Sequence, residues 1–263
     1  METTCTASRT SIVTGGMETT EPGEHEVHNR QKLLTNWNQD RLTKAKVGVI
    51  GAGGLGSRLL TSLARLGVSH LVFCDPDIVE LSKLNRQSFY PGQKFKNKAL
   101  SAAENLQREC TARTTLEAYA MPFQDVLMRY PGAFEDLDLL VCLVDNEPSR
   151  SAAAACGLAR AVPAIFSAVS RTSLNGYVFV QQNGGPCFGC ISTDGLDAAP
   201  HRCADPTVVY VHEAAMGIAS YATVALLMGW KLHWNYYSLI LDSDSHAMNR
   251  PRRADCGQCR GVK

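Results

Sequence analysis

One glycine-rich segment constrains the fold more than any other feature of this sequence. Gly51-Ala52-Gly53-Gly54-Leu55-Gly56 directly follows Val47-Gly48-Val49-Ile50, a short β-branched run typical of a buried parallel strand. It precedes a helical stretch with leucines at 55, 59, 60, 63 and 66 on one face, which Gly67 ends as a C′ glycine would. A strand, a G-x-G-x-x-G turn and a helix together predict a phosphate-binding turn at Gly51, Gly53, Gly54 and Gly56.

The rest of the chain continues the alternation of strands and helices. Further strands are expected at 70–74, 115–119, 139–144 and 164–168, with helices at 97–109, 123–130 and 149–161 between them. This pattern predicts an α/β fold with a doubly wound, mostly parallel, Rossmann-like sheet. The periodicity then changes to an antiparallel strand at 174–181, a long apolar helix at 208–230 and a late strand at 236–241. We expect one domain over 29–263 with an antiparallel C-terminal elaboration, preceded by a disordered polar tail over 1–28.

Composition excludes several classes of function. The 263 residues carry a formal net charge of +1, which argues against electrostatically driven binding to nucleic acid. No apolar run approaches about 18 residues, so the sequence predicts no membrane span. The first residues lack the apolar region of a secretory signal, and the cytoplasm is therefore the expected compartment, where cysteines remain thiols.

Asp75 ends the strand expected at 70–74 and is the second element of a nucleotide site. At this position a carboxylate reaches a ribose hydroxyl in many nucleotide-binding folds. The turn and Asp75 alone leave a dinucleotide cofactor and ATP both open.

The residues after Asp75 narrow the choice. The stretch Asp75-Pro76-Asp77-Ile78-Val79-Glu80-Leu81-Ser82-Lys83-Leu84-Asn85-Arg86-Gln87 is followed by an isolated Lys98 and then by Asp145-Asn146 after an apolar strand. In this order the segments resemble the ThiF/MoeB/HesA superfamily of adenylating enzymes, which includes the ubiquitin-activating enzymes. The resemblance runs from about residue 29 to 259. Lys83 departs from it, because the family usually has asparagine there.

The resemblance implies an activity. It implies ATP-dependent adenylation of the C-terminal glycine carboxylate of a small ubiquitin-like or sulfur-carrier protein ending in Gly-Gly, with acyl-AMP and pyrophosphate as products. A carboxylate is ionised at neutral pH, since an α-carboxyl pKa lies near ~3.5, so it needs positive charge beside the phosphates rather than a general base. Arg86 and Lys98 would supply that charge, and Asp145 would hold Mg²⁺.

The resemblance implies further contacts to the nucleotide. Ser82, Lys83 and Asn146 would lie beside it, and Arg30 would reach it from the partner subunit of a homodimer. An Asp-Asn pair after a strand also fits a simple helix N-cap, and a single lysine or arginine is commonly a solvated surface charge.

Four of the ten cysteines form two C-x-x-C pairs, Cys187/Cys190 and Cys256/Cys259. Four thiolates match a structural tetrahedral Zn²⁺ site, which would be a zinc knuckle tying the C-terminal segment to the domain. A redox C-x-x-C and four unligated thiols are the alternatives, but neither pair stands in the thioredoxin-like context of a redox motif. The resemblance to the adenylating family favours zinc.

Cys203 lies in a polar loop, Pro200-His201-Arg202-Cys203, before the long apolar helix. The resemblance implies that it accepts the activated carboxyl or joins a persulfide relay, with Arg202 favouring its thiolate. A small buried hydrophobic role is the alternative. In the same region His212-Glu213 reads as a capping element of the helix.

Other functions fit part of the pattern. The same adenylating fold acts on a tRNA base or a short peptide, and the near-neutral charge disfavours tRNA. The glycine turn and Asp75 by themselves would also suit an NAD-dependent oxidoreductase. A non-catalytic subunit of a heterodimeric activating enzyme is opposed by the presence of Arg86, Lys98 and Asp145.

Overall fold

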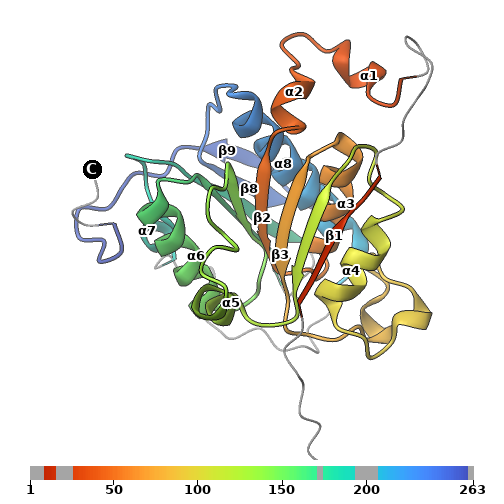
Figure 1. The fold of residues 1–263 in the computed structure, drawn as a ribbon. Coiled ribbons are helices and arrows are strands. Elements are labelled where there is room, and N and C mark those ends of the chain that lie inside the picture. The colour runs from red at the N-terminus through yellow and green to blue at the C-terminus, as the bar shows by residue number, and fades with distance from the viewer. Residues whose placement is uncertain (1–8, 16–25, 171–173, 193–206, 260–263) are drawn as a thin grey trace, which may run out of the picture.

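A single sheet with helices on both faces forms the centre of the molecule (Figure 1). The computed structural model describes residues 9–15, 26–170, 174–192 and 207–259. Its strands form one nine-stranded sheet in the order β1-β4-β3-β2-β5-β6-β7-β8-β9. In chain order they are β1 (Arg9–Val13), β2 (Lys46–Ile50), β3 (His70–Cys74), β4 (Thr115–Tyr119), β5 (Leu139–Cys142), β6 (Ala164–Val169), β7 (Asn175–Gln181), β8 (Tyr236–Ile240) and β9 (His246–Met248).

The helices that connect the parallel strands, α3 to α6, lie where the sequence predicts them. In chain order the helices are α1 (Asn29–Lys32), α2 (Gln39–Leu42), α3 (Gly56–Leu66), α4 (Lys98–Leu106), α5 (Phe123–Arg129), α6 (Glu147–Arg160), α7 (Phe188–Ile191) and α8 (Val209–Met228). Two 3₁₀ turns, η1 (Leu81–Lys83) and η2 (Pro91–Gln93), lie between β3 and α4.

The sheet changes winding direction between β2 and β5. Strands β4, β3, β2, β5 and β6 pair in parallel, and β1, β7, β8 and β9 join them through antiparallel pairs. The chain moves outward from β2 through β3 to β4, and then returns to the other side of β2 to form β5 and β6. This confirms the doubly wound, mostly parallel sheet with an antiparallel C-terminal elaboration. In such sheets the ligand crevice lies at the carboxyl ends of the strands beside the switch.

Both faces of the sheet are apolar and both are covered. Val49 of β2 and Leu60 of α3 belong to one buried cluster, which also contains residues of α4 and α8. Ile50, the next residue of β2, belongs to a second cluster with Phe123 of α5 and residues of α6 and α7. Successive side chains of a strand point to opposite faces, so a continuous apolar run such as 47–50 indicates a strand covered on both sides.

Helix α8 is the long apolar helix of the C-terminal half. By length and composition this 20-residue helix could cross a membrane. A window of 18 residues within it has a mean hydropathy of 1.3. The sequence analysis finds no apolar run of this length, because polar side chains such as His212 and Glu213 interrupt it. In the structure 61% of this window is buried, and the helix packs against α3 and the strands β5 to β8. This is the environment of a core helix.

Two strands were not expected from the sequence. Residues 9–13 lie in the segment for which composition predicts disorder, but they form β1, which pairs with β4 along its whole length. Arg9 Nη2 donates to Glu117 Oε2 at 3.0 Å across this pair. Five residues without a strongly apolar face give little local signal, because the pairing depends on the distant strand β4. The short strand β9 at the other edge of the sheet was missed for the same reason.

Candidate functional site

A cleft of about 500 Å³ lies at the carboxyl ends of β2, β3 and β5. Its walls come from the glycine turn, the segment after β3, the start of α4, the start of α6, the end of β6 and the first turn of α8. It therefore stands at the change of winding direction, where a doubly wound sheet binds its ligands.

The glycine turn needs glycine at two positions for reasons of space. Gly51 has φ of +93°, a conformation that favours glycine, and a Cβ there would lie 3.0 Å from the carbonyl oxygen of Leu143. A Cβ on Gly56 would lie only 1.9 Å from the carbonyl oxygen of Gly51. The turn thus folds tightly onto the start of α3, whose first N–H groups have no partner within the helix. Such a helix start favours the binding of a phosphate.

The carboxylate of Asp75 holds the glycine turn and the segment after β3 through hydrogen bonds to their backbone. One carboxylate oxygen, Oδ2, accepts from the backbone N–H of Ala52 at 2.7 Å, and Oδ1 accepts from that of Asp77 at 2.8 Å. Burial raises the pKa of Asp75, and the positive charge of Lys98 opposes that rise. The sequence analysis expects this carboxylate to face a ribose hydroxyl. The structure shows both of its oxygens holding the backbone around the cleft.

Lys98 is a buried cation of the cleft wall. It is 4% exposed, and its Nζ lies 2.7 Å from Asp77 Oδ2. Its backbone N–H donates to the carbonyl oxygen of Asp77 at 2.8 Å, so the start of α4 is tied to the segment after β3 at two points. Asn97 caps the helix by accepting from Leu100 N at 3.1 Å. The lysine is thereby fixed at the cleft.

Lys83 and Arg86 bring two more positive charges to the same wall. Lys83 is buried at the end of η1, and its Nζ lies 2.6 Å from Glu80 Oε1. Arg86 Nη1 donates to Asn85 Oδ1 at 2.9 Å, and burial lowers the pKa of Arg86 without removing its charge. The structure therefore brings together three of the expected cations: Lys83, Arg86 and Lys98.

Asp145 and Asn146 follow β5 at the opposite wall. Asn146 Oδ1 accepts from Ser149 N at 2.9 Å and so caps α6. The helix-cap alternative is correct for this residue, which also lines the cleft. Asp145 is exposed on the rim of the cleft. Its carboxylate is the hard oxygen ligand that Mg²⁺ prefers.

Two expected residues, Ser82 and Arg30, are not brought to this cleft. Ser82 is exposed on η1 and is not among the residues that line the cleft. Arg30 is exposed on α1, and Figure 1 shows α1 and α2 at the end of the sheet where β2 begins, away from the carboxyl ends of the strands. Within its own chain Arg30 therefore cannot line the cleft. Cys203 lies outside the described residues.

Sequence reasoning missed two residues of the cleft. Arg150, buried on α6, donates from Nε to the carbonyl oxygen of Val144 at 3.1 Å, and its guanidinium lies 5.9 Å from the ring centre of Phe188. It comes four residues after Asn146, hence on the same face of the helix, and that spacing was the available signal. His212 of α8 also lines the cleft. It was interpreted only as a capping element, because nothing local shows that α8 starts beside the glycine turn.

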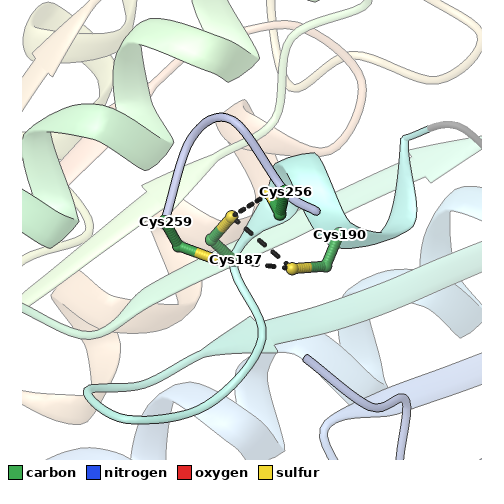
Figure 2. A group of neighbouring side chains, drawn as sticks. All are labelled: Cys187, Cys190, Cys256 and Cys259. Carbon is green, nitrogen blue, oxygen red and sulfur yellow. Dashed lines mark hydrogen bonds between the residues drawn. The ribbon is translucent and has the colours of Figure 1, made fainter. Parts of the chain in front are cut away.

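The four paired cysteines converge at a second site (Figure 2). Cys187 and Cys190 flank the start of α7, and their buried sulfur atoms lie with those of Cys256 and Cys259 within 4.8 Å of one another. Neighbouring sulfurs are 3.5, 3.6 and 3.9 Å apart. A tetrahedral Zn²⁺ with Zn–S bonds of about 2.3 Å requires sulfurs ~3.8 Å apart. The cluster fits zinc, and its closed set of four ligands matches a structural site.

Gln258 fixes the second cysteine pair to the domain. Its Oε1 accepts from the backbone N–H of Gly189 at 2.9 Å, and its Nε2 donates to the carbonyl oxygen of Ser151 on α6 at 2.8 Å. The backbone N–H of Arg253 points to Cys190 Sγ at 3.5 Å. Such hydrogen bonds around a metal site orient its ligands. Phe188, the residue after Cys187, packs against the guanidinium of Arg150, so the cluster adjoins one wall of the cleft.

Known proteins are similar to this chain in sequence and in fold. Residues 28–257 match the ThiF family. The adenylyltransferase and sulfurtransferase MOCS3 of Arabidopsis thaliana is 31% identical over 247 residues, which cover 88% of this chain and 51% of the relative. The mouse protein of the same name is 32% identical over 260 residues, with 88% and 52% covered.

A solved structure carries the same arrangement of elements. E. coli MccB in complex with ATP superimposes with a TM-score of 0.74 at 18% identity, covering 90% of this chain and 75% of MccB. The chain spans about half the length of the two MOCS3 relatives. The match over nearly the whole domain, the order of its motifs and the shared fold agree, and the chain therefore belongs to the ThiF family.

Proposed function

We propose that this protein uses ATP to adenylate the C-terminal glycine carboxylate of a small ubiquitin-like or sulfur-carrier protein that ends in Gly-Gly. The observation that carries the proposal is the gathering of Lys83, Arg86 and Lys98 beside the glycine turn. The names of the curated relatives support it, since they are adenylyltransferases and sulfurtransferases. A dinucleotide site would need no such concentration of positive charge.

The chemistry requires positioning rather than proton transfer. An oxygen of the ionised carboxylate attacks the α-phosphorus of ATP, the new P–O bond forms, and the bond to the β-phosphate breaks so that pyrophosphate leaves. Two anions must approach each other, so the barrier falls when fixed positive charges lie where negative charge gathers. Arg86 offers a planar fork to phosphate oxygens, and Lys98 offers a point charge.

Two carboxylates keep Lys83 and Lys98 in place beside the expected phosphate position. Asp77 pairs with Lys98 and Glu80 pairs with Lys83 at the cleft wall. Each pairing keeps a buried ammonium charged and oriented until phosphate oxygens compete for it. Lys83 stands where the family usually has asparagine, and we propose that it contacts phosphate.

Asp145 is the residue that we propose holds Mg²⁺. Mg²⁺ supplies neutralisation of phosphate charge when bound. The part of the rim that Asp145 occupies lies across the cleft from the cations, at the carboxyl end of β5. The carboxylate therefore lies on the side of the cleft away from those three cations.

Three further expectations belong to the same proposal. The cysteine cluster binds one structural Zn²⁺. The active form is a homodimer in which the partner's Arg30 reaches the nucleotide, since Arg30 of the same chain lies at the other end of the sheet. The sulfur of Cys203 takes the acyl group from the acyl-AMP and AMP leaves, and replacing Cys203 with alanine abolishes that transfer while leaving the adenylation step intact.

Carrier-dependent exchange between ATP and labelled pyrophosphate tests the proposal. We expect exchange with carriers ending in Gly-Gly and none with the same carrier bearing a C-terminal amide, because the amide offers no anionic oxygen. A short peptide with a free carboxylate is the second substrate to assay. Absence of exchange with every carboxylate, together with binding of NAD, would overturn the proposal.

A further inference from the structure

His212 is a buried histidine that the proposed reaction has not yet used. It lies on the first turn of α8 and is 5% exposed. Its Nδ1 is 2.9 Å from the carbonyl oxygen of Val208, so Nδ1 carries the proton of the neutral ring. The other nitrogen, Nε2, is then a lone-pair acceptor.

The Nε2 edge of this ring lies against the glycine turn. A Cβ built on Gly54 would be 2.8 Å from Nε2 and 2.6 Å from Cδ2. His212 also lines the cleft. No protein group in the described part of the chain hydrogen-bonds to Nε2. The ring therefore offers one unused nitrogen to the part of the cleft where phosphate is expected.

The charged groups that act on His212 come from three directions. Arg86 faces it from the segment after η1, Arg58 from α3, and Glu213 from α8 itself, where Glu213 is paired with Arg58. Burial lowers the pKa of His212 most, the hydrogen bond to Val208 opposes this, and the two arginines lower it further. The ring is thus neutral at neutral pH while the cleft holds no anion.

A phosphate bound at the glycine turn would favour the protonated form of His212 over the neutral form. The lone pair on Nε2 repels a phosphate oxygen, whereas an N–H at the same place donates a hydrogen bond to it. The negative charge of the phosphate also acts on the pKa of His212 in the direction opposite to the nearby arginines. The protonated ring is favoured in the complex, and the neutral ring is favoured in the free protein.

We propose that His212 takes up one proton from solvent when a phosphate group of ATP occupies the glycine turn, and binds that phosphate through Nε2–H. The proton returns to solvent when that phosphate leaves the turn. This deepens the proposed function and rests on it. His212 would then be a binding residue whose strength depends on pH, unlike the permanently charged Arg86.

The proposal has a measurable consequence. ATP binds more tightly as the pH falls, across the range between the pKa of His212 in the free protein and its higher pKa in the complex. The range begins below about 6.5, the usual value for histidine. Uptake of one proton changes the dissociation constant by up to about tenfold per pH unit in this range.

Calorimetry with a non-hydrolysable ATP analogue tests it. The dissociation constant is measured from pH 5.5 to 8, in pairs of buffers that differ in ionisation enthalpy so that proton uptake is counted. The variants are His212→Gln, which keeps a side-chain donor but does not titrate, and His70→Gln as the matched control. His70 pairs with Glu117 at the start of β3, far from the cleft.

Wild type and His70→Gln should take up about one more proton than His212→Gln, whose pH slope reports only the analogue's own titration. Equal slopes and equal uptake in all three proteins would overturn the inference while leaving the proposed function intact. No binding of the analogue to wild type at any pH would instead contradict the proposed function.

A second measurement covers the case in which His212→Gln does not fold. In wild-type protein labelled at histidine, one of the seven imidazoles should titrate at a higher pH when the analogue is bound. Titration of every imidazole unchanged by the analogue would contradict the inference.

Discussion

Lys98 and Asp77 form an ion pair on the cleft wall, with 2.7 Å between Nζ and Oδ2. The lysine is buried and the aspartate is more than half exposed, so the pair can open towards the cleft without breaking the core. This relationship makes Lys98 a cation that is held in place before its substrate arrives.

Removing this cation should slow adenylation without unfolding the protein. For Lys98→Ala we expect carrier-dependent pyrophosphate exchange to fall by on the order of 10²-fold or more, which is typical for the loss of one group that stabilises transition-state charge. Lys96→Ala is the matched control, because Lys96 is exposed and pairs with Glu104 instead. Equal exchange rates in the two variants would exclude a role for Lys98 in the reaction.

Alanine variants at Gly56 and Gly53 should separate an effect on folding from an effect on ATP binding. Gly56→Ala places a Cβ 1.9 Å from the carbonyl oxygen of Gly51, so we expect it to lower the free energy of unfolding by about 1–3 kcal/mol or more. Gly53→Ala should be tolerated by the fold, since the nearest atom to its Cβ is 3.9 Å away. It should still weaken ATP binding, because its methyl group occupies the approach to the turn. Thermal melting and ATP titration of both variants measure the two effects separately.

The cysteine cluster should hold one zinc ion per chain. We expect Cys256→Ser to lose that metal and to melt at a lower temperature, because structural zinc contributes directly to folding free energy. Cys110→Ser removes another buried cysteine that lies outside the cluster, and it should keep the zinc. Metal analysis of the purified proteins checks this, and wild-type protein purified without zinc would refute it.

Glu117 should make the protein sensitive to acid. It accepts hydrogen bonds from His70 at 2.7 Å and from Tyr119 and Arg9 at 3.0 Å each. The hydrogen bond from His70 contributes most to lowering the pKa of Glu117 from 4.5 to about 2. A carboxylate with a lowered pKa stabilises the fold fully above its unfolded value, and that stabilisation is lost as the pH falls from about 4.5 towards 2.

The comparison of wild type with Glu117→Gln isolates this effect. Urea unfolding between pH 3 and 6 should show the wild-type advantage shrinking as the pH falls, since the amide does not titrate. Any zinc held by the cysteine cluster would leave both proteins in acid, so only the difference between them is informative. A difference that stays constant with pH would show that the carboxylate is not coupled to folding.

The sequence predicts most of the parallel sheet because its signals are local. The run 47–50, the glycine turn and Gly67, which has φ of +84°, each follow from a few neighbouring residues. The boundaries of β3 and β4 are the predicted ones. Strand β1 is different, since its five residues are ordered by pairing with Thr115–Tyr119, about a hundred residues later.

The residues of the site also fall into two groups: those with a signal in the sequence and those placed only by packing. Lys83, Arg86 and Lys98 follow from the order of motifs along the chain, and the four cysteines follow from two local pairs. His212 and Arg150 could not be identified in this way, because they reach the cleft only through the packing of α8 and α6 around it. The backbone contacts of Asp75 could not be predicted either, since no sequence pattern shows that each of its oxygens accepts from a backbone N–H group.

A crystal structure of the protein with a non-hydrolysable ATP analogue and Mg²⁺ tests the central claim most directly. The account predicts the phosphates on the turn at residues 51–56, with Arg86 bound to them and Lys98 turned from Asp77 towards them. A cleft that stays empty at saturating analogue, or that accepts NAD in preference to it, would contradict the account.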